Sequence, residues 1–292
     1  MKPKGWSRPF ARLVGLGILA TLPVCGQEKK TEGSIPTATR WTLESVPVNQ
    51  RPVVSSVLLI ECRKTLAKGT AFLLKSGTIV TNVHVVRGCK PEELWAQSSM
   101  GTTVSFVKML VDENRDIAIL RSNEHLAGGL ELGSDSPPSL ETKVKTWGYP
   151  LRYQGYAPIL SIGYVAGYNT SGDAQKPVKR LVVNGAFNPG NSGGPLVSDS
   201  DGRVVGIVVA KWTLFSPNIE EAIKGFRNPR ASMGGTFSIT LPDGTQKGIT
   251  DQEVLASVIE EFYRTVQVMI GEAISVSELR AFLHEQESEL RQ

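Results

Sequence analysis

Short apolar runs rich in β-branched residues, separated by turn residues, dominate the chain between about residues 51 and 210. The Ser76-Gly77 turn, for example, separates two such runs. This spacing is typical of a β-barrel or sandwich and not of βαβ units. The predicted strands are Val53–Glu61, Thr70–Leu74, Thr78–Val83, Thr102–Leu110 and Ile117–Leu120, followed by Lys143–Gly148, Ile159–Ala166, Leu181–Asn184, Pro195–Val197 and Val204–Ala210.

The strand pattern has two halves. The segment Gly133–Ser139, of sequence GSDSPPS, contains the residues that end regular structure and marks the boundary. We therefore expect a first unit over about 51–133 and a second over about 140–275. Before them, residues 27–50 are polar with scattered prolines, and we interpret them as a linker.

The segment 211–265 interrupts the second half. It is irregular and polar up to about residue 250, and Asp251–Arg264 then places apolar residues at helical spacing. We predict a helical insert there, packed on the second unit through Val254, Val258 and Phe262. Its role is not evident from the sequence.

The end of the chain returns to regular structure. Gln267–Ile274 is a further predicted strand. Ser275–Arg291 is charged and amphipathic, which predicts a terminal helix with Ser275 or Ser277 as its N-cap.

Composition adds a leader to this picture. The 292 residues are 40% hydrophobic and 21% charged, as in an ordinary globular protein. Residues 1–26 hold four basic and no acidic side chains, which leaves 28 of each charge in the rest of the chain. The pI of about 8.9 thus reflects the leader, and we expect no nucleic-acid partner.

The leader has an apolar run, Leu13–Val24, that suits secretion and is too short for a comfortable membrane span. Cleavage after Gly26 would give a mature start near Gln27. Alternatively, Leu22–Cys25 acts as an imperfect lipobox and Cys25 is lipidated, or the leader stays as an uncleaved anchor. No other segment is apolar enough to span a membrane, so we expect an exported, periplasmic or extracellular protein, with a lipoprotein as the alternative.

Cys62 and Cys89 remain once the leader is removed. An exported protein can keep a disulfide, so these two are a candidate pair. Two unpaired thiols packed as small apolar residues are an equally open interpretation.

Three short stretches carry candidate chemistry: TNVHVV around His84, RDIAIL around Asp116 and NPGNSGGPL around Ser192. A serine hydroxyl is a weak nucleophile until a base takes its proton, and an imidazole can do so near neutral pH. A carboxylate behind the imidazole fixes its tautomer. The chain order His, Asp, Ser is the one used by proteases built from two barrels.

These stretches resemble those of trypsin-like peptidases, and specifically of the bacterial HtrA/Deg-type branch. The similarity covers roughly residues 51–210 and resumes at Ile270–Phe282, where GEAISVSELRAFL resembles that branch's last strand and terminal helix. It implies an all-β fold, a double six-stranded antiparallel β-barrel, with the helical insert and the C-terminal helix (about 275–291) added. It also implies Ser192 as nucleophile, His84 as general base and Asp116 as orienting carboxylate, with the N–H groups of Gly190 and Ser192 as oxyanion hole.

Other assignments of these residues are weaker. Asp112 and Glu113 compete with Asp116 for the carboxylate role. The GNSGG stretch also fits the GxSxG nucleophile elbow of α/β-hydrolases, but Pro195 follows too closely for a helix there. His284, the histidine that follows Ser192, lies in the charged tail, and we interpret it and His125 as ordinary side chains.

Two positions depart from the digestive enzymes of the resembling family. Asn191 stands where those enzymes carry the Asp that receives a new N-terminus, so that ion pair cannot form here. Ala186 stands where trypsin carries an Asp, which favours a small or aliphatic residue before the cleaved bond. Lys211 is a further candidate for the specificity pocket and would favour acidic side chains.

The sequence thus predicts a secreted serine endopeptidase acting on proteins or peptides, with no cofactor and no metal. Too few residues follow the last predicted strand for a PDZ module, which is frequent in the HtrA branch. One alternative is a catalytically silent protease fold that binds peptides or partner proteins. Another is a chaperone-like binder that also cleaves. The oligomeric state is not evident from the sequence.

Overall fold

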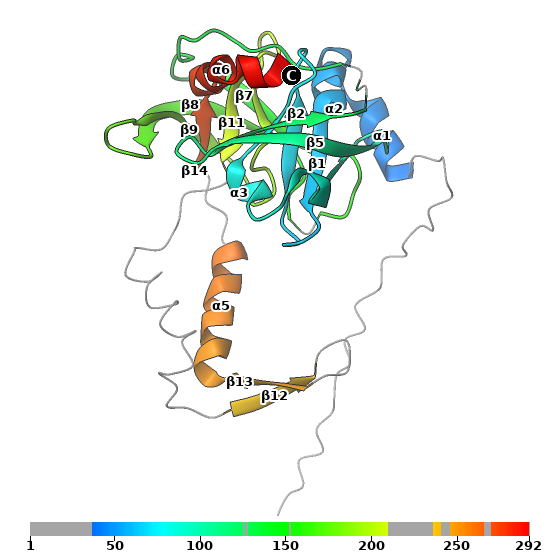
Figure 1. Cartoon of the computed structure of the whole chain (residues 1–292), viewed down its shortest axis with the longest axis vertical. Helices are drawn as coiled ribbons and strands as arrows, with labels where there is room; N and C mark the ends of the chain where they lie inside the picture. Colours follow the sequence, from blue (N-terminus) through cyan, green and yellow to red (C-terminus); the bar gives the residue numbers. More distant parts are fainter. Residues whose placement is uncertain are drawn as a thin grey trace, which may run out of the picture.

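Two closed six-stranded antiparallel barrels form the body of the molecule, which confirms the predicted double-barrel fold (Figure 1). The computed structural model describes residues 37–124, 126, 128–151, 153–209, 236–240, 246–265 and 270–291. In sheet order, the first barrel contains β1 (Val57–Cys62), β2 (Lys68–Leu73), β3 (Ile79–Thr81), β6 (Ile117–Ser122), β5 (Thr103–Asp112) and β4 (Leu94–Ser98). The second contains β10 (Pro195–Ser198), β11 (Val204–Val209), β14 (Ile270–Ser275), β9 (Val178–Gly185), β8 (Ile159–Ser171) and β7 (Lys143–Gly148).

Each barrel has its own apolar filling, and a third cluster joins the two. Side chains such as Ile60 fill the first barrel, and side chains such as Val183 fill the second. Phe72 of β2, Trp147 of β7 and Ile207 of β11 belong to the shared cluster. Because both barrels pack into this common core, the loops that meet between them are held in a fixed relation.

The N-terminal side of the first barrel differs from the prediction. The expected linker over 27–50 contains helix α1 (Thr37–Ser45) and the 3-10 helix η1 (Val48–Gln50) in its described part. The strand expected from Val53 begins at β1, because Arg51–Ser56 is helix α2, with a proline in its first turn and the Ser56 hydroxyl donating to Pro52 O at 2.7 Å. Proline in the first turn is compatible with a helix, because its missing N–H would have no intrahelical partner there.

The insert contains more regular structure than the sequence predicted. Strands β12 (Thr236–Thr240) and β13 (Gln246–Thr250) form a hairpin, and helix α5 (Asp251–Thr265) follows as predicted. The expectation that α5 packs on the second barrel through Val254 and Val258 is wrong, since these side chains are 38% and 59% exposed. Helical periodicity predicts an apolar face but not the surface that covers it. The side chain of Phe262 lies outside the described residues.

The C-terminal region contains the predicted strand and helical segment, but the single helix predicted over Ser275–Arg291 is two helices in the structure. β14 is followed by α6 (Val276–Glu285) and α7 (Glu287–Arg291), and Ser275 is the N-cap, its side chain accepting from Ser277 N–H. Leu279 and Phe282 of α6 are buried in the shared core. Among the described helices, none combines the length and the apolar character needed to cross a bilayer. The predicted leader lies outside the described residues.

Candidate active site

His84 lies on a four-residue helix, α3 (Val83–Val86), directly after β3. Its neighbours Val83, Val85 and Val86 are buried in the core of the first barrel, whereas the His84 side chain is 39% exposed. The strand predicted to run to Val83 therefore ends earlier. The change from strand to helix turns the imidazole out of the barrel. The three buried valines anchor the helix that carries it.

Asp116 holds His84 through both of its carboxylate oxygens. Its Oδ2 lies 2.7 Å from His84 Nδ1, and its Oδ1 accepts the backbone N–H of His84 at 3.0 Å. Asp116 has a φ of +58°, a region that residues other than glycine seldom adopt, and its carbonyl accepts Asn82 Nδ2–H at 2.9 Å. When Nδ1 carries the proton of a neutral imidazole, Nε2 is the acceptor. The arrangement suits a base whose tautomer is fixed by a carboxylate.

The two competing carboxylates bind elsewhere. Asp112 accepts from the Nη1 of Arg115 at 2.6 Å, and Glu113 accepts from the Nη2 of Arg87 at 2.6 Å. Asp116 is therefore the candidate that the structure pairs with the imidazole.

Ser192 lies in a tight loop between β9 and β10 and is 6% exposed. Asn191 N–H donates to Asn188 O and Gly194 N–H donates to Asn191 O, each at 3.0 Å. The carbonyl of Ser192 accepts Thr70 N–H of the first barrel at 2.9 Å. The loop is thus closed on itself and also hydrogen-bonded to the barrel that carries His84 and Asp116.

Gly190 has a conformation and surroundings that require glycine. Its φ is +99°, and a Cβ there would lie 2.4 Å from Tyr149 O and 2.5 Å from Leu151 N. The preceding carbonyl, Pro189 O, accepts Leu151 N–H at 2.7 Å, and the described chain has no cis peptide bond. Since N–H and C=O point to opposite sides of a trans peptide, Gly190 N–H points away from Leu151. By the same reasoning, Ser192 N–H points away from Gly194, whose N–H donates to Asn191 O.

Asn191 is fully buried, and neither side-chain atom has a hydrogen-bond partner among the described residues. It lies against Gly148, where an added Cβ would be 2.7 Å from Asn191 Oδ1. A carboxylate in this place would need a cation, because an unpaired buried charge is far more costly than an unpaired amide. The neutral side chain is compatible with the prediction that no N-terminal amine is required, which remains untested.

A buried guanidinium adds positive charge near the candidate site. Arg180 on β9 is 8% exposed, and its Nε donates to Ser171 Oγ at 2.7 Å. Burial lowers the pKa of Arg180, while the carboxylates of Glu272, Asp116 and Glu278 act in the opposite direction. The side chain therefore lies within electrostatic reach of Asp116.

The predicted specificity pocket is only partly described. Ala186 is half-buried and follows directly after β9. Lys211 lies outside the described residues. The preference for the residue before the cleaved bond remains a prediction.

Cys62 and Cys89 are bonded to each other in the structure, with Cα atoms 6.0 Å apart, which answers the question that the sequence left open. Cys62 ends β1, and Cys89 follows α3, with its N–H donating to Val86 O at 3.1 Å. The bond thus joins the end of β1 to the segment that follows α3, the helix that carries His84.

Sequence reasoning missed two residues that support the site, Thr70 and Arg115. Thr70 is fully buried, and Arg115 forms ion pairs with Asp112, Glu278 and Glu285. The adjacency of Arg115 to Asp116 was a visible signal. Thr70 gave none, because its partners are distant along the chain.

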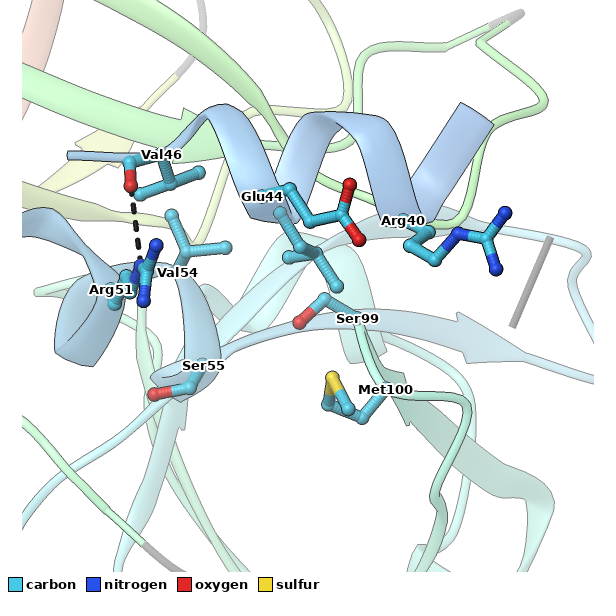
Figure 2. A pocket seen from close by; sticks show the side chains of 9 residues that line it. Arg40, Glu44, Val46, Arg51, Val54, Ser55, Ser99 and Met100 are labelled. Carbon is cyan, nitrogen blue, oxygen red and sulfur yellow. Dashed lines mark hydrogen bonds between the residues drawn. The ribbon is translucent and has the colours of Figure 1, made fainter. Parts of the chain in front are cut away.

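A separate groove of about 320 Å³ lies between α1, α2 and the turn after β4 (Figure 2). Figure 2 shows Arg40 and Glu44 on α1 and Met100 facing the same space, and Arg51 Nε donates to Val46 O at 3.3 Å. None of the nine lining residues belongs to the predicted catalytic set. In the described part of the chain, no group of three or more His, Cys, Asp or Glu side chains is arranged to hold a metal.

Comparison with known proteins agrees with the double-barrel fold. The family model described as "Trypsin-like peptidase domain" matches residues 69–207. The chain is 31% identical over 167 residues to the chloroplastic Protease Do-like 1 of Arabidopsis thaliana, covering 55% of this chain and 36% of the relative. It is 33% identical over 144 residues to a probable periplasmic serine endoprotease DegP-like of Hahella chejuensis, covering 48% of this chain and 29% of the relative. The match thus spans about a third of the length of these relatives.

A solved structure shares the fold. The Rv3671c protease in its inactive form matches with a TM-score of 0.52 at 17% identity, covering 82% of this chain and 92% of that chain. At this identity the match concerns the fold alone.

Proposed function

Since the chain carries a trypsin-like peptidase domain of the HtrA/Deg type, we propose that it is a serine endopeptidase with His84, Asp116 and Ser192 as its catalytic triad. The observation that carries the proposal is the 2.7 Å contact between His84 Nδ1 and Asp116 Oδ2. It is supported by the second bond, from the His84 backbone N–H to Asp116 Oδ1, which fixes the carboxylate relative to the helix that carries the imidazole.

In the first half of the reaction, Ser192 Oγ attacks the carbonyl carbon of the peptide bond, and its proton passes to His84 Nε2. Asp116 stabilises the resulting imidazolium without taking the proton itself. The tetrahedral intermediate then collapses, the C–N bond breaks, and the proton on Nε2 passes to the leaving amine. The product of this half is an acyl-enzyme on Ser192.

In the second half, water attacks the acyl carbon, gives its proton to His84, and Ser192 leaves with that proton. Both tetrahedral intermediates carry a negative oxygen. Gly190 N–H and Ser192 N–H are the donors for it, and the hydrogen bonds of Pro189 O and Asn191 O set their directions. Removing one such donor typically lowers kcat by about 10²–10³.

Proteins and peptides are the substrates we infer, with a small or aliphatic residue before the cleaved bond because Ala186 offers no charge. We place the enzyme outside the cytoplasm, in the periplasm or beyond. Three observations support this location: the apolar leader, the Cys62–Cys89 bond, and relatives named as periplasmic.

A serine-directed fluorophosphonate tests the proposal. We expect it to label the folded wild-type chain and not Ser192→Ala, while Ser200→Ala, altered at a serine outside the triad, keeps the label. The labelled wild type should also lose its ability to cleave an unfolded protein. Failure of the folded wild type to react would reject the proposal and favour a silent, peptide-binding protease fold.

A further inference from the structure

The Thr70 hydroxyl joins three segments at the candidate oxyanion hole. Thr70 belongs to β2 of the first barrel and is fully buried. Its Oγ1 donates to Gly190 O at 2.6 Å and accepts Tyr149 N–H, after β7, at 3.0 Å. Both partners come from the second barrel, so the hydroxyl bridges the two barrels where the loop with Ser192 begins.

The backbone of Thr70 strengthens this link. Its N–H donates to Ser192 O at 2.9 Å, and its carbonyl accepts Thr81 Oγ1–H of β3 at 2.8 Å. A single residue therefore binds Gly190 through its side chain and Ser192 through its main chain. These are the two residues whose N–H groups we assign to the oxyanion hole.

The hydroxyl also controls the conformation of Gly190. Two successive carbonyls of the loop are held, Pro189 O by Leu151 N–H and Gly190 O by Thr70 Oγ1. The peptide planes on both sides of the Gly190 Cα are thus fixed, and with them its φ of +99°. Without the hydroxyl, the second plane loses its anchor, and glycine is the residue with the widest choice of other conformations.

We propose that Thr70 is a positioning residue for the oxyanion hole: its hydroxyl holds the Gly190 carbonyl toward the first barrel and keeps the Gly190 and Ser192 N–H groups aimed at the same point. The inference rests on the proposed function. It predicts that Thr70 acts on the transition state and not on substrate binding or on the base.

The variants Thr70→Val and Thr70→Ser separate the hydroxyl from the size of the side chain. Valine keeps the shape and removes the hydroxyl, whereas serine keeps the hydroxyl and removes a methyl group. Thr146→Val is the matched control, since Thr146 is also fully buried in a strand but its hydroxyl has no partner among the described residues. Thr70→Ala replaces Thr70→Val if the latter does not fold.

Each full-length variant is measured for kcat, KM, melting temperature and rate of fluorophosphonate labelling. We expect Thr70→Val to lower kcat and labelling by about 100-fold, as small misplacements of catalytic groups do, with KM nearly unchanged. Thr70→Ser should stay within about threefold of wild type because the hydrogen bond is kept. The pH of half-maximal kcat/KM should not move, because the contacts of His84 with Asp116 are untouched.

The outcomes are distinct. If the folded wild type is not labelled at all, the proposed function fails and this inference falls with it. A labelled wild type together with a Thr70→Val variant that turns over like Thr146→Val overturns the role of Thr70 alone. Equal losses in Thr70→Ser and Thr70→Val would also overturn it, since they would assign the effect to packing.

Discussion

Arg115 and Glu285 form a two-bond ion pair between the first barrel and the C-terminal helix. Nη1 and Nη2 of Arg115 donate to the two oxygens of Glu285 at 2.8 and 2.7 Å. Nε of Arg115 also donates to Glu278 at 3.3 Å, and both glutamates lie on α6. Because Arg115 directly precedes Asp116, whose φ is +58°, the helix that ends the second barrel supports the turn that presents the candidate triad carboxylate.

We expect Arg115→Gln to lower both activity and stability. It leaves Glu278, Glu285 and Asp112 without their shared cation and loosens the turn before Asp116. A loss of about 1–2 kcal/mol would lower the melting temperature by about 2–8 °C, and kcat should fall by about tenfold or more as Asp116 shifts. Melting scans and kinetics on the same preparation measure both effects.

Lys108→Met is the matched control. Lys108 on β5 pairs with Glu289 of α7 at 2.9 Å, so it also links the first barrel to the C-terminal helices, but it is not adjacent to Asp116. Its removal should leave kcat unchanged. Equal kcat losses in both variants would contradict a specific role for Arg115.

The pH dependence of stability should report the same ion pair. The hydrogen bond with Arg115 lowers the pKa of Glu285 below its ordinary value of 4.5. A lowered folded-state pKa contributes stability above the unfolded value, and that contribution is lost as the pH falls through the folded one. Glu285→Gln should therefore melt at a lower temperature than wild type at pH 7, and the difference should shrink steadily below about pH 4.5. A difference in melting temperature that stays constant from pH 7 to pH 3 would contradict a stabilising ion pair between Glu285 and Arg115.

Reduction of the Cys62–Cys89 disulfide should destabilise the first barrel. The cysteines are separated by 27 positions, for which the chain-entropy model gives about 3–4 kcal/mol. We expect a reductant to lower the melting temperature of wild type and to leave Cys62→Ala/Cys89→Ala unaffected. Intact mass after alkylation without reductant should show neither thiol modified, and two alkylated thiols would refute the bond.

Local patterns predicted most of the barrel strands, although not β4, because strands such as β1, β2 and β11 are buried over nearly their whole length and a continuous apolar run records that burial. β7 has the predicted bounds, Lys143–Gly148, and Ser275 is the predicted cap. The same reasoning failed at Val53, where β-branched residues suggested a strand. There Pro52 and the Ser56 hydroxyl favour a helical turn, and packing decides the outcome.

Only part of the candidate site could be predicted from the sequence. His84 and Asp116 stand in recognisable stretches, and the structure joins them directly. Thr70 could not be found in this way, because its hydroxyl meets Tyr149 and Gly190, which are 79 and 120 positions away. Such contacts are set by the docking of one barrel on the other, and no local periodicity encodes them.

Conversion of Asp116 to an amide should disable the base by changing its tautomer. The carboxylate accepts two bonds from His84, from the backbone N–H and from the ring Nδ1, and an asparagine has one oxygen and one NH2 group for these two places. The backbone N–H cannot change, so the oxygen stays there and the NH2 group faces the ring. Nδ1 must then accept, the proton moves to Nε2, and Nε2 can no longer take the proton of Ser192.

We therefore expect Asp116→Asn to lower kcat by about 10⁴, with KM and the melting temperature close to wild type. Steady-state kinetics on a peptide ester and a melting scan provide the two readouts. Glu113→Gln is the control, since Glu113 is a nearby carboxylate that pairs with Arg87 at the surface, and it should keep full activity. If Asp116→Asn turned over within about tenfold of wild type, the carboxylate would not be fixing the tautomer, and Asp116 would have to be removed from the triad.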